Sequence, residues 1–206
     1  MKSFLFVGLP AALALAALAG CSSLDVLSEP DPIPVTVNTY AAMEFGNATR
    51  GVAVGLDLSD CVEHAMLISK RPFGGSSVDA QFPVQDVVRR EFAKCIDQNF
   101  HATRPGEMDD VRLKVTTMRI LLTDRFTKVT SDVSLNIKVL HPDGTRAPLF
   151  RKTYRSQTYG PMDDDDEVPT CFYRSVQEIV SEFVTDISAN PNLVEYFKGK
   201  SKEKTK

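Results

Sequence analysis

Few side chains in this 206-residue sequence are of the types that perform catalytic or metal chemistry: four cysteines and three histidines. The histidines are His64, His101 and His141, and none has a second histidine or a cysteine at the spacing of a metal site. The sequence has no Cys-x-x-Cys pair, no Gly-x-Ser-x-Gly nucleophile motif and no glycine-rich phosphate loop. We therefore expect a protein that is not an enzyme and that uses no catalytic residue, metal or cofactor.

Cys21 ends a segment with the features of a secretory signal. Lys2 gives a short positive start, and residues 4–18 form an apolar run that is short for a membrane span. Leu18-Ala19-Gly20-Cys21 then places small residues before a cysteine, and this tetrapeptide resembles the lipobox of bacterial lipoproteins. The resemblance implies cleavage after Gly20, diacylation of the Cys21 sulfur and N-acylation. The alternative is an ordinary secretory signal with an incidental cysteine.

The residue after the cysteine bears on location. In the lipoprotein pattern, Asp at this position retains the protein at the inner membrane, whereas this sequence has Ser22. The resemblance therefore implies an outer-membrane protein that faces the periplasm, with the inner membrane as the alternative. The implied partners are the bacterial membrane, through the lipid anchor, and an envelope protein complex. A formal net charge of −3 and the absence of Trp argue against nucleic-acid binding.

The periodicity of apolar residues divides the rest of the sequence into elements. Alternating patterns predict strands, and apolar residues three and four apart predict two helices with one apolar face each. The expected strands cover residues 35–37, 52–58, 62–68, 111–122, 129–139 and 149–159, the helices residues 83–100 and 170–188, and loops residues 71–80 and 162–168. This order predicts an α+β fold: a two-layer sandwich, with a mostly antiparallel sheet and two helices packed on one face.

The sequence is expected to have four parts. These are a lipoprotein signal peptide at residues 1–20, the lipidated cysteine and a proline-containing tether at residues 21–34, the α+β domain at residues 35–189, and a flexible basic tail at residues 190–206. The tether should hold the domain off the bilayer, because Pro30, Pro32 and Pro34 favour extended backbone. The tail solubilises the protein or, alternatively, touches anionic lipid.

Three cysteines besides Cys21 are available for a disulfide, which an oxidising periplasm permits. If strand 62–68 and helix 83–100 run in opposite directions, Cys95 near the helix end returns to Cys61 at the strand start. Cys171 opens the other helix at the opposite end. A Cys61–Cys95 bridge is therefore the favoured pairing, and three buried thiols packed as small hydrophobes are the alternative.

Residues 163–167, Asp-Asp-Asp-Asp-Glu, form the densest charge cluster. Such a cluster can bind Ca²⁺ or a basic partner, but it lacks the ligand spacing and the glycine of a calcium loop. A solvated loop, whose charges favour the positive N-terminal end of the following helix, is the preferred interpretation.

The order of elements after a lipobox resembles a group of small outer-membrane lipoproteins, the LptE, YajG and PqiC-like (ABC-type transport auxiliary) families. The resemblance covers roughly residues 50–188 and is carried by the strand at 52–58, the helix at 85–100, the strands within 111–139 and the helix at 171–187. It implies a non-catalytic accessory or interaction subunit of an envelope transport or assembly complex. The alternative is a module in which the helices and sheet part to bind a lipid or small molecule.

Mass spectrometry of the mature protein tests the assignment of Cys21. We expect a chain that begins at Cys21 and carries the added mass of a diacylglyceryl and an N-acyl group. Cys21→Ser removes the sulfur that forms the thioether and should abolish this mass, whereas Cys61→Ser should keep it. A mature product with an unmodified Cys21 would contradict the prediction.

Overall fold

The computed structural model describes residues 25–26, 43–70, 76–103, 107–125, 128–161 and 167–203. The predicted signal peptide, Cys21, the expected strand at 35–37, residues 163–166 of the acidic cluster and the last residues, 204–206, lie outside these ranges. No helix of the described residues is long and apolar enough to cross a membrane.

Twelve helices and strands make up the described part of the chain. The helices are α1 (Met43–Thr49), α2 (Val84–Asn99), α3 (Glu167–Ala189) and α4 (Pro191–Glu203). The strands are β1 (Asp25–Val26), β2 (Ala53–Asp57), β3 (His64–Lys70), β4 (Ser76–Pro83), β5 (His101–Ala102), β6 (Val111–Arg125), β7 (Lys128–Leu140) and β8 (Phe150–Pro161).

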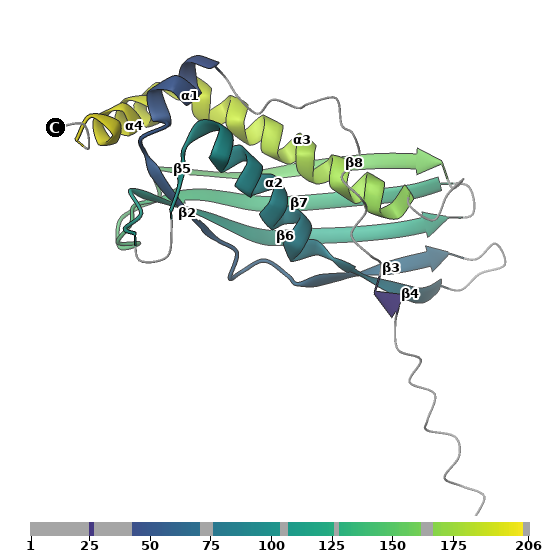
Figure 1. Ribbon diagram of the computed structural model, residues 1–206. Coiled ribbons are helices and arrows are strands. Elements are labelled where there is room, and N and C mark those ends of the chain that lie inside the picture. Colours follow the sequence, from purple (N-terminus) through teal and green to yellow (C-terminus); the bar gives the residue numbers. More distant parts are fainter. Residues whose placement is uncertain are drawn as a thin grey trace, which may run out of the picture.

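The two long predicted helices are confirmed as α2 and α3. Pro83 precedes the first turn of α2, and the apolar residues spaced three and four apart in both helices are buried. Figure 1 shows α2 and α3 crossing the strands on the same side of the sheet. The apolar face that the sequence pattern predicted on each helix is therefore the face that meets the sheet or the other helix.

The predicted α+β class is confirmed, but the prediction of a mostly antiparallel sheet is wrong. Strands β6, β7 and β8 form the expected antiparallel meander. Both β2 and β3, however, run parallel to β6: Val54 of β2 lies opposite Val111, and Leu67 of β3 opposite Leu122. The short β1 and β5 also pair in parallel, with β4 and β2. Alternating apolar residues predict that a segment is a strand, but they carry no information about its direction.

Strand β4 was not predicted, because Pro72, Gly74 and Gly75 favour a loop before it. It pairs antiparallel with β3, so that His64 at the start of β3 lies opposite Pro83 at the end of β4. Helix α2 follows directly. With this additional strand, the chain reverses direction once more than predicted. The start of β3 therefore lies beside the start of α2 and not beside the end of α2.

The C-terminal residues also differ from the prediction. Residues 191–203, expected to be part of a flexible tail, form helix α4. Pro191 stands at its first turn, and the Asn190 side chain accepts a hydrogen bond from the Leu193 amide at 3.2 Å, as an N-cap does. The ring of Phe197 is 1% exposed and lies 6.0 Å from the ring of Phe45 in α1 and 5.4 Å from that of Phe100. Helix α4 thus closes one end of the core.

Substitution in α4 tests whether these residues belong to the folded domain. We expect Phe197→Ala to lower the free energy of unfolding by about 3–5 kcal/mol, because it leaves a cavity among packed aromatic rings. The neighbouring exposed residue gives the control, since Lys198→Ala should change stability by less than about 0.5 kcal/mol. Chemical denaturation measures both. Equal stability of the two variants would mean that the segment is a tail.

Candidate interaction surface

The three histidines lie far apart in the fold. His64 is an exposed residue of β3. His101 lies on β5, with its Nε2 atom 3.3 Å from Glu107. His141 comes directly after β7, and its ring contacts that of Tyr196. Among the residues that the structure describes, no three His, Cys, Asp or Glu side chains come together in a way that could hold a metal ion. The histidines therefore form no common site.

The cysteines Cys61, Cys95 and Cys171 are free and buried, so the predicted Cys61–Cys95 bridge is not formed in this structure. The backbone carbonyl of Cys61 accepts a hydrogen bond from the side chain of Gln85, in the first turn of α2. Cys95 lies ten residues further along that helix, roughly 15 Å away at 1.5 Å per residue. A disulfide requires Cα atoms about 4.4–6.8 Å apart. The two cysteines are separated because the unpredicted strand β4 places Cys61 beside the first turn of α2, whereas Cys95 lies near the end of that helix.

Burial makes these thiols poor nucleophiles. Desolvation raises the pKa of Cys95 to about 12. Desolvation also raises the pKa of Cys61, although a hydrogen bond with Thr117 opposes the shift. Because the thiolate is the reactive form, neither cysteine is suited to nucleophilic chemistry near neutral pH.

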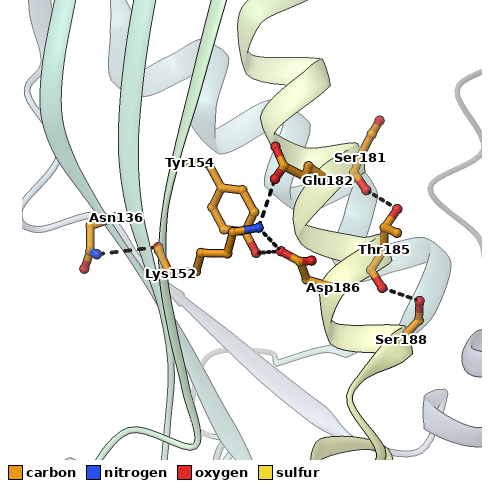
Figure 2. Close-up of polar contacts among 8 residues, drawn as sticks. All are labelled: Asn136, Lys152, Tyr154, Ser181, Glu182, Thr185, Asp186 and Ser188. Carbon is orange, nitrogen blue, oxygen red and sulfur yellow. Dashed lines mark hydrogen bonds and ion pairs between the residues drawn. The ribbon is translucent and has the colours of Figure 1, made fainter.

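A polar cluster joins α3 to β8 (Figure 2). The Lys152 ammonium donates to Asp186 at 2.7 Å and to Glu182 at 2.9 Å, and the Tyr154 hydroxyl donates to the same Asp186 oxygen at 2.7 Å. Burial, together with the hydrogen bond to Asp186, raises the pKa of Tyr154. Its side chain is 1% exposed, so the hydroxyl is out of reach of a substrate. The cluster holds the helix on the strand.

Two further buried clusters secure the same helix. The carboxylate of Glu91 in α2 accepts hydrogen bonds from the Tyr173 hydroxyl of α3 and from Lys94, the latter at 2.8 Å. Deeper in the core, the Ser175 hydroxyl of α3 lies 2.9 Å from that of Thr158 and donates to Ser131 at 3.1 Å. Because these groups bond to one another, they fix the position of α3.

The sheet has a second face, opposite to α2 and α3, which we call the open face. On β7 the odd-numbered residues are buried beneath the helices and the even-numbered ones point to the open face. At its centre Asp132 accepts two hydrogen bonds from the Arg155 guanidinium, at 2.9 and 2.8 Å, and lies 3.4 Å from Arg119. The hydrogen bond from Arg155 lowers the pKa of Asp132, against burial, and Arg119 adds to the effect.

A shallow groove of about 380 Å³ lies on the open face between β3 and β6. We call it the apolar groove; its apolar lining includes Val62, Met66, Ile68, Met118 and Leu121. Three of these side chains are unusually exposed for their type: Val62 at 43%, Met66 at 48% and Met118 at 60%. The groove therefore gathers solvent-exposed apolar side chains in a concave site.

A β-bulge creates part of the groove. The register of β6 against β7 shifts between Thr117 and Arg119, which leaves Met118 as the extra residue. Beside the bulge, the Thr117 amide donates to the carbonyl of Asp60, in the crossing from β2 to β3, at 3.2 Å. The bulge was not predicted, although the sequence of β6 contains a signal for it. The buried apolar positions of β6 change from odd numbers, as at Val115, to even numbers, as at Leu122.

No protein-family model and no curated protein matches this chain. A solved structure does share its fold. A protein from Xanthomonas campestris bearing the family name DUF330 matches 87% of this chain and 95% of its own, with a TM-score of 0.50 and 15% identity. A candidate lipoprotein from Caulobacter crescentus gives a TM-score of 0.41 at 10% identity, over 76% of this chain and 97% of its own. A lipoprotein from Neisseria meningitidis gives 0.37 at 8% identity, over 68% and 99%.

Acid titration tests the role of Asp132. Asp132→Asn should lower the free energy of unfolding at pH 7 by about 1–2 kcal/mol, because the bonds to the exposed Arg155 lose their charge. The pKa of Asp132 is lower in the folded protein than in the unfolded chain, where it is near 3.8. The ionised Asp132 therefore stabilises the fold fully above pH 3.8, and this contribution is lost as the pH falls through the pKa of Asp132 in the folded protein. The difference between wild type and variant should therefore vanish below that pH. A constant difference in urea unfolding from pH 7 to pH 2 would contradict this role.

Proposed function

We propose that this protein is a non-catalytic lipoprotein of the bacterial envelope, anchored in the outer membrane and facing the periplasm, and that it serves as an accessory or interaction subunit of a transport or assembly complex. The observation that carries the proposal is the sequence Leu18-Ala19-Gly20-Cys21, which lies just ahead of the folded sheet. The inner membrane is the alternative location.

The pairing of β1 determines how closely the domain follows its anchor. The predicted tether spanned residues 21–34, but Asp25 and Val26 within it pair with Ala80 and Gln81 of β4. Only Ser22, Ser23 and Leu24 then separate the lipidated residue from the sheet. A chain of this length spans at most about 14 Å, so the proposed anchor holds the domain at the membrane surface.

The polar interior supports a non-catalytic role. The clusters around Asp186, Glu91 and Ser175 join helices and sheet, with their members bonded to one another; Glu91 and Ser175 are buried, and Asp186 is part-buried. The exposed groove on the open face is lined mainly by aliphatic and thioether side chains. His64 is the one general base among the described residues of this lining, and no carboxylate or thiol accompanies it there. Such an arrangement suits recognition better than bond-making. The fold shared with the Xanthomonas protein supports the α+β architecture and is neutral on the role.

The apolar groove also favours a second candidate function, the binding of a lipid or small apolar molecule. Its volume of about 380 Å³ falls at the lower end of ligand-binding sites. Unlike the site that the sequence analysis considered, between the helices and the sheet, the groove lies on the open face.

Affinity purification in mild detergent tests the proposed function. We expect the wild-type protein and Cys61→Ser to reach the outer membrane and to recover the same envelope membrane protein in similar yield. Cys21→Ser should not reach that membrane and should lose the partner. Cys61→Ser is the matched control because serine can keep the hydrogen bond with Thr117.

Repeated recovery of the acylated protein alone would count against an accessory subunit. Native mass spectrometry of the same eluate distinguishes the second candidate, which requires a lipid or small molecule bound in addition to the covalent anchor.

A further inference from the structure

We propose that the apolar groove is a membrane-docking surface, which rests on the head groups of an anionic bilayer beside the lipid anchor. This inference deepens the proposed function and rests on acylation of Cys21. It assigns the orientation of the domain: the β1–β4–β3 edge of the sheet and the adjoining part of the open face point toward the membrane.

The register of the sheet places the groove next to the anchored end of the chain. Val26 of β1 lies opposite Gln81 of β4, which lies opposite Met66 of β3. With strands about 4.8 Å apart, the backbone of Met66 is roughly 10 Å from that of Val26. Cys21 precedes Val26 by five residues, a span of at most about 17 Å. Acyl chains inserted in the bilayer therefore bring the groove within reach of the head groups.

The opposite end of β6 is much further from the anchor. Met118 lies in the groove, whereas Met108 precedes β6, ten residues earlier, about 33 Å away along an extended chain. Met108 is 87% exposed and belongs to no part of the groove. The protein therefore contains exposed methionines both near the anchored edge and far from it.

Beyond the groove, the open face carries side chains typical of a membrane interface as far as Tyr159 on β8, three strands or roughly 14 Å from Ile68. Tyr159 is 49% exposed, and the Lys128 ammonium lies 3.6 Å from the centre of its ring. Tyr159 shares one row of the sheet with Ile68 of the groove, through Thr130 and Thr123. Tyrosine and lysine place an apolar body and a polar tip at the head-group level, and flexible methionines adapt to an irregular apolar surface.

The charge of the open face complements an anionic surface, although the whole chain carries a formal net charge of −3. On β6, β7 and β8 the described side chains that point to this face include one carboxylate, Asp132. The described cations of these strands nearest the groove are Arg119, Arg155 and Lys128, of which Arg119 and Arg155 pair with Asp132. Toward the opposite end of the strands lie Lys138, Arg151, Lys114, which pairs with Asp60, and Arg112, which pairs with Asp109. Basic groups close to a membrane surface are attracted by phosphate head groups within a Debye length.

Methionine oxidation on vesicles tests the docking surface. The acylated protein is reconstituted in protein-free vesicles of phosphatidylethanolamine and phosphatidylglycerol, treated with hydrogen peroxide and analysed by peptide mass spectrometry. From their exposure alone, Met66 and Met118 should react within about a factor of two of Met108. On the bilayer we expect both to react about tenfold more slowly than Met108, because their sulfurs are screened from the oxidant.

A matched pair of variants separates docking from local structure. Met118→Glu places a carboxylate in the groove and should restore rapid oxidation of Met66, whereas Met108→Glu, with the same change of charge far from the groove, should leave Met66 protected. Both substituted residues are exposed, so neither change should disturb the core.

Each other outcome overturns the inference. Equal oxidation of the three methionines in acylated, vesicle-bound protein would overturn docking alone and leave the anchor intact. Protection in native membranes but not in protein-free vesicles would assign the groove to a protein partner, and protection that grows with protein density would assign it to a second copy. A Cys21 without acyl mass would overturn the proposed function together with the docking surface.

Discussion

The long strand β6 is the constraint on which the rest of the fold depends. It spans 15 residues and pairs with β7 along one edge over nearly its whole length. Along its other edge it accepts two shorter strands in succession, β2 at its start and β3 at its end. The chain crosses from β2 to β3 beside Thr117, where the bulge lies. The parallel pairings and the exposed position of Met118 both follow from this double use of one edge.

Both burial of apolar side chains and hydrogen bonds hold α3 on this sheet. The apolar face of the helix supplies most of the stabilisation, through side chains such as Phe172 and Phe183 that are almost completely removed from water. The Asp186 and Ser175 clusters add directional contacts that would be costly to leave unpaired. Together they engage these polar groups in contacts between helix and sheet, and the open face is left as a surface available to a partner.

The proposed lipid anchor accounts for the exposure of the apolar groove. An exposed apolar groove on a freely diffusing protein would be a liability, since such patches favour association. In the proposed arrangement, three residues separate the lipidated cysteine from β1 and two strands separate β1 from the groove. The groove would then face a bilayer at high effective concentration, where weak contacts suffice to orient the domain. The pairing of Asp25 and Val26 with β4 replaces the expected proline-containing tether by a short connection.

The sequence by itself determined the elements with strong periodicity. The apolar spacing of α2 and α3 and the alternation in β2, β3, β6, β7 and β8 predicted their types, because burial of one face is a local pattern. It also carried the resemblance to a lipobox around Cys21, a purely local signal. It could not determine strand direction, because alternation is the same in parallel and antiparallel strands.

Only the tertiary structure decided the features that depend on distant partners. Strand β4 forms next to glycines because β3 supplies its hydrogen bonds. Residues 191–203 form helix α4 because Phe197 packs against Phe45 and Phe100. The separation of Cys61 from Cys95 and the assembly of the groove from β3 and β6 follow from these pairings. Contacts between residues far apart in sequence leave no period in either segment alone, and their free energy appears only when both segments are in place.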